Sequence, residues 1–267
     1  MLAAFMCKGP VLEIQFPADF DWHAWIERWD KMQDRYVLCR KERFELMVRL
    51  IAYTRHTISG ILDIGCGTGS LMLLILERFP DTEVYGIDFD PTLLALAEKR
   101  LTRFGERAHL IQTDLREQPW LKLVPAPIDA AISATALHWL NPEQLGRFYR
   151  QLARILRPGG IFLNADHVRS SQADIQKKWE QNREQMHRQK ADPEADDWDG
   201  FWNEYGKVLK MDIEQFRSAF TGPWEGSEQG MPLEWHFEKL KASGFEALDC
   251  FWRLDCDAIY GGIRQEN

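Results

Sequence analysis

Three glycines at alternate positions follow a short apolar run in the stretch ILDIGCGTGS, residues 61–70. Glycine lets a backbone turn approach a ligand closely, and a glycine-rich turn between a strand and a helix is typical of nucleotide binding. Cys66, between the glycines, is interpreted as a small filler. The carboxylate of Asp63 stands at the entrance of this turn, where a phosphate-binding turn would not be expected to carry one. The three glycines are Gly65, Gly67 and Gly69.

Two more carboxylates follow predicted strands: Asp88 ends EVYGID and Asp114 ends HLIQTD. In open α/β sheets ligands bind at the carboxyl ends of the strands. A G-x-G-x-x-G/A turn with an acid about 20 residues further on indicates a dinucleotide site, and taken alone this pattern is compatible with a dehydrogenase. The third position here is Ser70, however, and a pyrophosphate beside Asp63 would cost on the order of several kcal/mol, with no Lys or Arg in the turn to compensate. The acids therefore favour a phosphate-free, cationic adenosine ligand, and S-adenosylmethionine, with its sulfonium and ammonium groups, fits.

His138 and His167 follow the fourth and fifth predicted strands, so we expect both at the same edge of the sheet. Methyl transfer is an in-line displacement that depends on holding the nucleophile near the methyl group. A base is needed only where the acceptor has a proton to lose, and histidine has a suitable pKa. Both histidines are candidate catalytic residues, with His167 preferred because His138 looks like part of a motif that shapes the donor pocket. The alternative is that each is a hydrogen-bonded packing residue.

From residue 60 onward, apolar strand-like runs alternate with helical patterns, which predicts βαβ units and a parallel sheet with helices on both faces. A helical pattern from Pro142 is predicted to stop at Pro158 and Gly159. The last two apolar runs surround Asp255 and suit an antiparallel hairpin. The predicted strands lie at residues 61–65, 83–88, 109–114, 128–135, 161–166, 246–254 and 257–263.

The segments on either side of this alternation have different patterns. Trp22, Trp25, Ile26 and Trp29 form one apolar helical face, and the chain up to about residue 57 lacks strand signals. Residues 168–230 are polar, helical and aromatic. We expect one integrated domain made of an N-terminal helical cap (1–58), a core (59–167), a helical lid or acceptor insertion (168–230), and a helix and hairpin that complete the core (231–267).

Composition limits the possible functions. The 267 residues carry a net charge of −8, which disfavours general nucleic-acid binding because phosphate contacts need clustered Lys and Arg. Five cysteines without CxxC spacing argue against a disulfide framework or a zinc site. No signal peptide and no membrane span are recognised. We therefore expect a soluble, cytoplasmic protein with a small-molecule acceptor, no metal, and no nucleic-acid or membrane partner; the oligomeric state is not predicted.

Several motifs in order resemble those of the class I S-adenosylmethionine-dependent methyltransferases over Gly60 to Asp166. LDIGCGTG resembles their first motif, VYGIDFDP the second, LIQTDLRE the third, DAAISATALHWL the fourth, and LARILRPGGIFLNAD the segment leading to the fifth strand. The resemblance implies an α/β, Rossmann-like, doubly wound sheet of seven strands with the last antiparallel. It also implies S-adenosylmethionine as cofactor and methyl transfer to O, N or C of a small molecule.

The resemblance also implies residue roles. Asp63 would act near the methionine ammonium through the turn and its waters, Asp88 would accept from the ribose, and Asp114 would lie near the adenine amine. Tyr36 and Arg40, one helical turn apart on the predicted cap, are candidates for the donor's carboxylate, with surface pairing as the alternative. The other donor-binding candidates are Gly65, Cys66, Gly67, Gly69, Phe89, Thr113, Leu115, Ser133 and Thr135. The candidate acceptor-pocket residues are Trp139, Trp198, Trp202 and Trp224, with helix packing as the alternative.

Three other functions stay open. An NAD-dependent oxidoreductase on a related fold is disfavoured by Asp63 and by the absence of phosphate ligands in the turn. A non-catalytic subunit that binds the donor or a partner protein would be expected to lose motifs that are intact here. A nucleic-acid methyltransferase is disfavoured by the acidity and by the lack of an N/D-P-P-Y/F motif after the fourth strand.

Overall fold

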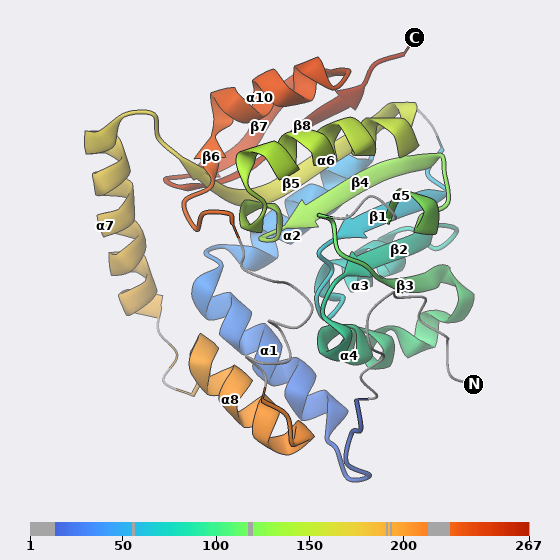
Figure 1. Cartoon of the computed structure of the whole chain (residues 1–267), viewed down its shortest axis with the longest axis vertical. Helices are drawn as coiled ribbons and strands as arrows, with labels where there is room; N and C mark the ends of the chain where they lie inside the picture. The colour runs from blue at the N-terminus through green and yellow to red at the C-terminus, as the bar shows by residue number, and fades with distance from the viewer. Residues whose placement is uncertain are drawn as a thin grey trace.

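A computed structural model describes residues 14–54, 57–116, 120–190, 192, 194–212 and 225–266. An eight-stranded sheet crosses the molecule in the order β3-β2-β1-β4-β5-β8-β7, and the short β6 pairs with β5 outside this path (Figure 1). The strands are β1 Gly60–Ile64, β2 Glu83–Asp88, β3 Ala108–Gln112, β4 Ile128–Ala134, β5 Leu156–Arg169, β6 Met231–Pro232, β7 Phe245–Leu254 and β8 Asp257–Arg264.

Strands β1 to β5 pair in parallel, whereas β8 pairs antiparallel with both β5 and β7. Because β7 is antiparallel to β8, it runs in the direction of β5, and β8 alone is reversed. This confirms the predicted α/β sheet with an antiparallel last strand. The two-residue β6 is an addition that was not predicted, and it pairs parallel with the end of β5.

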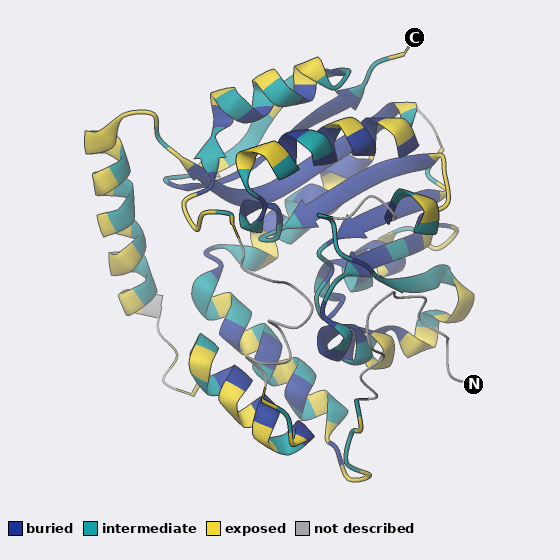
Figure 2. Ribbon diagram, in the orientation of Figure 1, coloured by how far each residue is buried: buried dark blue, intermediate teal, exposed yellow. Residues whose placement is uncertain are grey.

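Helices cover both faces of the sheet and form the cap. One apolar core lies under α5, α6 and α10, and a second lies under α2, α3 and α4. The strands between these layers are largely buried (Figure 2). The helices are α1 Trp22–Tyr36, α2 Arg40–Ile51, α3 Ser70–Arg78, α4 Pro91–Leu101, α5 Trp120–Leu123, α6 Pro142–Ile155, α7 Ala173–Lys190, α8 Trp198–Leu209 and α10 Leu233–Ala242, with 3₁₀ turns at η1 Thr102–Arg107 and η2 Leu137–Trp139.

Helix α6 shows how local sequence sets these boundaries. The Asn141 side chain accepts from Gln144 N at 2.8 Å while Gln144 Oε1 accepts from Asn141 N, so a capping box starts the helix. The helix ends at Ile155, three residues before the predicted stop at Pro158, because Leu156 is already extended and pairs with Ile128 of β4. The predicted end is therefore wrong, since pairing with the sheet takes over before the proline is reached.

The cap and the insertion meet at the carboxyl edge of the parallel strands. Helices α1, α4 and α8 share an aromatic cluster that includes Trp25, Trp29, Phe201 and Tyr205. Helix α7 lies at the side of the molecule (Figure 1), and no residue of it with described burial is fully buried. No helix in the described part of the chain is both long and apolar enough to cross a membrane.

Candidate functional site

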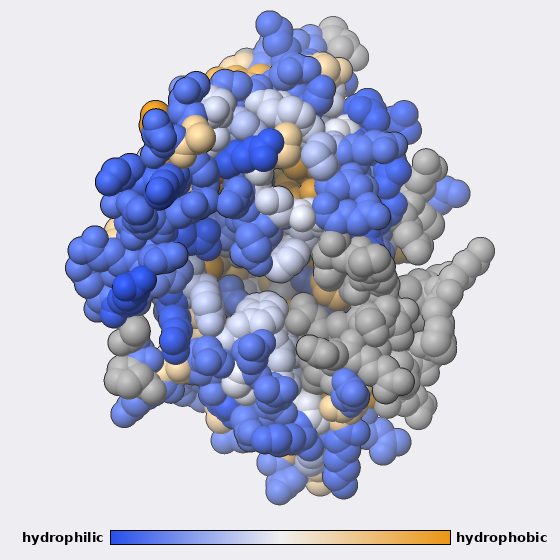
Figure 3. Space-filling model, turned by 60° about the vertical axis from the view of Figure 1, so that its left-hand side comes forward, coloured by the Kyte–Doolittle hydropathy of each residue, from blue (hydrophilic) through white to orange (hydrophobic). Residues whose placement is uncertain are grey.

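A cavity of about 370 Å³ opens at the carboxyl edge of the parallel strands, between the sheet and the cap. Figure 3 shows pale and apolar side chains in the middle of this face, surrounded by hydrophilic ones. Many residues that the sequence singled out line this cavity. They are Tyr36, Gly65, Gly67, Asp88, Phe89, Thr113, Asp114, Leu115, Thr135, His138, Trp139, His167 and Trp198.

The glycine turn has the geometry that its composition predicts. Gly65, Gly67 and Gly69 all have positive φ, at 67°, 52° and 73°. A Cβ on Gly65 would lie 2.3 Å from the Cβ of Ala136, so a side chain there would collide with the turn after β4. The amide of Gly67 donates to Asp88 Oδ2 at 2.8 Å. The turn is therefore held against the end of β2 by a carboxylate rather than by a basic side chain.

Two carboxyl groups lie close together behind this turn. Burial raises the pKa of Asp88 to about 6, although Asp88 accepts from the amides of Gly67 and Asp90. Burial, and then the nearby charge of Asp88, raise the pKa of Asp63 to about 8. Asp63 lies in the core beneath the cavity, and its Oδ2 has no hydrogen-bond partner among the described residues. A cation bound near the turn would stabilise both ionised groups.

Asp114 lies at the cavity wall and is already paired. Its Oδ1 accepts from the backbone amide of Arg116 at 2.8 Å, and its carboxylate accepts from the Arg116 guanidinium at 3.0 Å. The pairing with Arg116 was not predicted from the sequence, although an acid two residues before an arginine allows such a local turn. The remaining lone pairs of the Asp114 carboxylate could accept hydrogen bonds from a ligand.

Several predicted site residues lie away from the cavity. Ser133 donates to Ile64 O at 2.9 Å, and Cys66 packs in the core under α2 and α3. Trp202 is buried in the aromatic cluster of the cap. Gly69 shapes the turn without lining the cavity, and Trp224 lies outside the described residues.

The prediction that Tyr36 and Arg40 share one helix is wrong. Helix α1 ends at Tyr36 and α2 begins at Arg40, with Cys39 between them in the left-handed region at φ 54°. Arg40 pairs with Asp30 and Asp34 of α1, which is the surface pairing kept open as the alternative. Tyr36 does line the cavity, and its hydroxyl accepts from Trp198 N at 3.0 Å.

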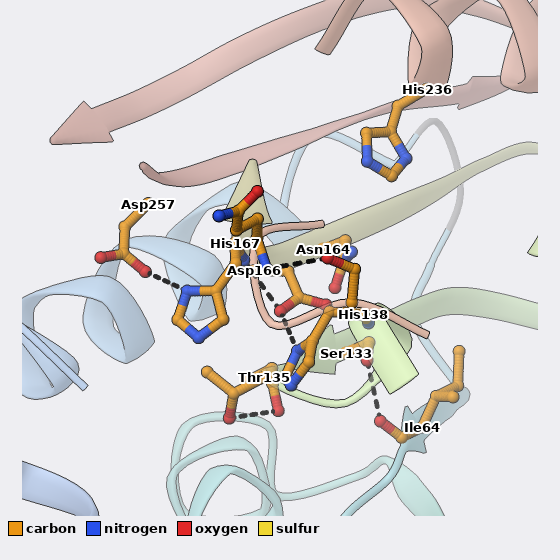
Figure 4. Close-up of polar contacts among 12 residues, drawn as sticks. Ile64, Ser133, Thr135, His138, Asn164, Asp166, His167, His236 and Asp257 are labelled. Atoms are coloured by element: carbon orange, nitrogen blue, oxygen red, sulfur yellow. Dashed lines mark hydrogen bonds and ion pairs between the residues drawn. The ribbon is translucent and has the colours of Figure 1, made fainter. Parts of the chain in front are cut away.

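The first of two histidine–aspartate pairs joins His138 to Asp166, near the carboxyl ends of β4 and β5 (Figure 4). His138 Nδ1 lies 2.7 Å from Asp166 Oδ1, and the amides of His138 and His167 also donate to this carboxylate. Burial alone would raise the pKa of Asp166, but His138 and His167 hold it well below its usual range. The ionised carboxylate can only accept, so His138 Nδ1 carries the hydrogen and Nε2 is left with a lone pair when the ring is neutral.

The second pair joins His167 to Asp257. His167 Nδ1 lies 2.9 Å from Asp257 Oδ1, and the Arg43 guanidinium donates to the same oxygen at 3.2 Å. On the other side of the ring, Arg183 Nη2 lies 3.2 Å from His167 Nε2. Burial lowers the pKa of His167. A guanidinium is only a donor, so Nε2 accepts and His167 is a neutral imidazole in this arrangement.

The two histidine rings are 4.9 Å apart, and both line the cavity. The sequence analysis predicted the histidines but not the partners Arg43, Asp257 and Arg183. A signal for one of them existed, because His167 and Asp257 face each other where β8 pairs with β5. Arg43 and Arg183 come from helices whose docking no local pattern reveals.

A short segment before β6 fixes the backbone of both histidines. Ser227 N donates to His138 O at 2.9 Å. A Cβ on Gly226 would lie 2.1 Å from His138 O, and one on Gly230 would lie 2.1 Å from His167 O. Glycine at both positions therefore lets the segment pack directly on the histidines.

His138, Asp166 and His167 are close enough to share a metal ion, with one potential ligand atom from each within 4.8 Å of the others. In this arrangement, however, Asp166 already accepts three N–H groups and His167 Nε2 accepts from a guanidinium. A cation would have to displace these donors and lie beside Arg183. The contacts therefore favour two hydrogen-bonded pairs over a metal centre.

Comparison with known proteins is consistent with this geometry. Residues 61–160 match a family model described as a methyltransferase domain. Trans-aconitate 2-methyltransferase of Acidovorax ebreus is 35% identical over 127 residues, which cover 47% of this chain and 45% of that protein. Carboxy-S-adenosyl-L-methionine synthase of Campylobacter lari is 25% identical over 149 residues, which cover 56% of this chain and 62% of that protein. The chain thus covers less than two thirds of either relative.

Solved structures support the fold. The CurJ carbon methyltransferase superposes with a TM-score of 0.59 at 15% identity, covering 89% of this chain and 58% of that one. Human N-acetylserotonin methyltransferase in complex with SAM superposes with a TM-score of 0.51 at 14% identity, covering 94% of this chain and 60% of that one. At these identities the likeness establishes the Rossmann-like fold alone.

Proposed function

We propose that the chain is a class I S-adenosylmethionine-dependent methyltransferase, whose residues 61–160 match a methyltransferase domain, and that it transfers a methyl group to a small-molecule acceptor. The observation that carries the proposal is an acidic, glycine-lined end of the cavity that faces a pair of histidines. Bound there, the donor supplies an electrophilic methyl group on a sulfonium with a good leaving group.

The described residues fit this donor in both charge and shape. Asp88, at the end of β2, would accept hydrogen bonds from the ribose hydroxyls, as predicted from the sequence. Phe89, Asp114 and Leu115 would border the adenine, and the turn at Gly65 and Gly67 would border the methionine part. The Oδ2 of Asp63 is buried and has no hydrogen-bond partner among the described residues. A positive charge bound at the turn would therefore stabilise the ionised form of this carboxyl group.

The cavity offers little to a pyrophosphate. Among the described lining residues, Arg183 is the only arginine or lysine, and it contacts His167 at the end of β5 rather than the glycine turn. A dinucleotide would place two negative charges beside Asp88 and Asp63 with no cation to compensate. This argues against the NAD-dependent oxidoreductase, the principal alternative on this fold.

The acceptor side needs a group that holds the nucleophile in line and takes its proton. His138 is the better candidate, because Asp166 fixes Nδ1–H and leaves Nε2 as an acceptor, whereas Nε2 of His167 is occupied by Arg183. From the sequence, His167 was the preferred candidate for the catalytic histidine. We assign the proton-accepting role to His138 for acceptors that react through a hydroxyl, and the tilted ring of Trp139, 4.8 Å from His138, would form part of the acceptor wall.

Calorimetric titration of the chain with S-adenosylmethionine, S-adenosylhomocysteine and NAD tests the donor assignment. Binding of the first two with no response to NAD supports it, and binding of NAD alone would overturn it. The acceptor class is tested by incubation with methyl-labelled donor and a panel of hydroxy acids, phenols and amines, with bulk transfer RNA as a further arm. Transfer to small molecules is expected; label appearing in RNA alone would contradict the small-molecule assignment, and donor binding with no transfer anywhere would favour the non-catalytic subunit.

A further inference from the structure

We propose that Arg183, oriented by His167, forms a carboxylate-binding subsite in the cavity, so that the methyl acceptor is a small organic acid. This inference rests on the proposed function, because it assigns the part of the cavity that the donor does not need. It concerns the side of the cavity formed by α7 and the end of β5.

Arg183 reaches the cavity from one face of α7. The partly buried residues of this helix recur at helical spacing and share that face with Arg183, whereas the other described residues are exposed. The helix is thus only weakly amphipathic. Among its described residues, Arg183 is the one that lines the cavity. The residues of the partly buried face are Gln176, Trp179, Glu180, Arg183, Met186 and His187.

His167 fixes how the guanidinium lies. One N–H of Arg183 donates to His167 Nε2, and the ring is held from behind by Asp257. Arg183 also makes a side-chain hydrogen bond to Cys256. An arginine has five N–H donors in a planar fork, so some remain for a ligand after these two contacts. A carboxylate matches such a fork with two parallel hydrogen bonds, which is the strongest pairing open to this side chain.

The positive charge of Arg183 acts on the protein's own acids only from beyond ion-pair distance, where it helps to lower the pKa of Asp257. Asp257, the buried carboxylate behind His167, is paired with Arg43, and Asp166 is satisfied by three N–H donors. Glu228 lines the cavity but is exposed. Within the described part of the chain, no carboxylate lies within ion-pair distance of Arg183, which leaves this cation free for a ligand.

The surroundings also indicate the body of the acceptor. Tyr36, Trp139 and Trp198 line the same cavity, and the backbone amide of Trp198 donates to Tyr36 Oη, which holds the Tyr36 ring in place. Aromatic walls favour a flat or apolar body, while Arg183 favours an acidic substituent. His138 Nε2 lies on the same side, since the two histidine rings are 4.9 Å apart. The acceptor therefore combines an acid group with a nucleophile within reach of His138.

The test uses the full chain saturated with S-adenosylhomocysteine and compares benzoate with its neutral analogue benzamide. Calorimetry gives both dissociation constants, and the ring signals of histidine-labelled protein show whether His167 senses the ligand. We expect benzoate to bind at least about tenfold more tightly than benzamide, and R183Q to abolish that preference. R183K should retain part of it, because the charge stays while the fork is lost.

R188Q is the matched control, since Arg188 lies on the same helix, exposed and paired with Glu184. It should leave the benzoate preference unchanged, and the melting temperature of R183Q should stay the same because α7 has no fully buried residue among those described. His167 is tested as a positioning residue by two variants. H167Q, whose amide oxygen can still accept from Arg183, should retain more of the preference than H167L.

The outcomes separate this inference from the proposed function. If the unmodified chain does not bind S-adenosylhomocysteine, the methyltransferase assignment itself is contradicted. If the donor product binds but benzoate shows no saturable response, or binds no better than benzamide, the carboxylate subsite is wrong. A preference for benzoate that survives R183Q would also overturn it, because Arg169 at the smaller neighbouring cavity would then be the anion's partner.

Discussion

The two ends of the cavity are built in different ways. The end near the glycine turn is made by a turn and the ends of neighbouring strands: Gly67 N donates to Asp88 Oδ2, and Thr113 N donates to Asp88 O. The histidine end is made by side chains from distant elements. Arg43 comes from α2 and Asp257 from β8, and they meet His167 of β5 and Arg183 of α7.

This difference has a consequence for function. A site made by a turn and strand ends depends on the sheet, which is the most buried part of the molecule, so its shape changes little when helices are replaced. At the histidine end, by contrast, Arg183 comes from the peripheral helix α7 and can be replaced without disturbing the sheet. We therefore expect the glycine end to set the affinity for the donor and the histidine end to set the choice of acceptor and the rate of transfer.

The sharpest test of this division, and the largest expected effect, is H138Q. Loss of the proton acceptor should lower the rate of methyl transfer to a hydroxyl acceptor by about 10²- to 10⁴-fold, while the dissociation constant for S-adenosylhomocysteine stays within about twofold. Transfer of labelled methyl and calorimetry measure the two quantities. H109Q is the control, because His109 is exposed on β3 and pairs with Glu83. Equal loss of donor affinity in H138Q would break the proposed separation of the two ends.

The opposite pattern is expected for D88N. The amide replaces an oxygen that accepts from Gly67 N and removes the charge that would accept from the ribose. Hydrogen bonds to charged groups contribute about 1.5–3 kcal/mol each, so donor affinity should fall about 10- to 100-fold in calorimetric titration. D81N, at an exposed acid in the turn before β2, is the matched control. Unchanged donor affinity in D88N would remove Asp88 from the proposed donor site.

The same division explains which features the sequence predicted. The alternation of strands and helices is a local signal, so the parallel sheet could be derived from the residues, whereas the reversed last strand was implied by the family resemblance and by the hairpin pattern around Asp255. The glycines of the turn were recognisable because positive φ at Gly65, Gly67 and Gly69 demands that residue type. Asp88 was found because a strand end and a turn are set by neighbours in sequence.

The misplaced features depend on long-range packing. Arg40 was a candidate for the donor's carboxylate on the expectation of a continuous helix. Instead, the helix breaks at Cys39, and Arg40 pairs with Asp30 and Asp34, which is the alternative that the sequence left open. Trp202 has the aromatic character of a pocket wall, but it is needed to pack α8 against α1. Arg183 carried no signal at all, because a charged residue on a polar helix looks the same whether it faces solvent or a cavity.

A smaller effect, confined to the glycine end, is a dependence of donor binding on pH. The pKa of Asp88 is raised to about 6, so below that pH the group is protonated and loses the negative charge that would strengthen its hydrogen bonds to the ribose. Donor affinity should fall as the pH drops through 6, by up to about tenfold per pH unit, and binding near pH 6 should release protons. Calorimetry in buffers of different ionisation enthalpy measures the release. D88N should abolish the proton release near pH 6. Proton release from Asp63 should persist, but at a lower pH than in the unmodified chain, because the charge of Asp88 no longer raises the pKa of Asp63.

The stability of the unliganded protein should depend on pH in the opposite direction to donor affinity. The folded-state pKa of Asp88 lies above that of the unfolded chain, so the unliganded protein should lose unfolding free energy as the pH rises from about 4 to about 6. Saturation with S-adenosylmethionine should reduce that loss, because its cationic groups stabilise the carboxylate. Denaturant unfolding at several pH values, with and without donor, checks it. A loss of stability that donor leaves unchanged would argue against a cation near Asp88.

The smallest expected effect concerns the cap, and it tests whether α1 influences donor binding at the glycine end or acceptor choice at the histidine end. Asp30 of α1 accepts from Arg100 at 2.8 Å and from the Ser70 hydroxyl at 2.9 Å, so it joins the cap to the helix that begins just after the glycine turn. D30N leaves Arg100, which is mostly buried, without a charged partner. It should lower the free energy of unfolding by about 2 kcal/mol, between the values typical of exposed and buried pairs.

D34N is the control, since Asp34 is largely exposed and pairs only with Arg40 among the described residues. Because the Asp30 contacts lie beside the turn, D30N should also weaken donor binding by a few fold in calorimetry, while the ratio of benzoate to benzamide affinity stays unchanged. A change in that ratio with donor binding intact would place the effect of the cap at the histidine end. The cap would then govern acceptor choice, and the division between the two ends would have to be redrawn with α1 on the acceptor side.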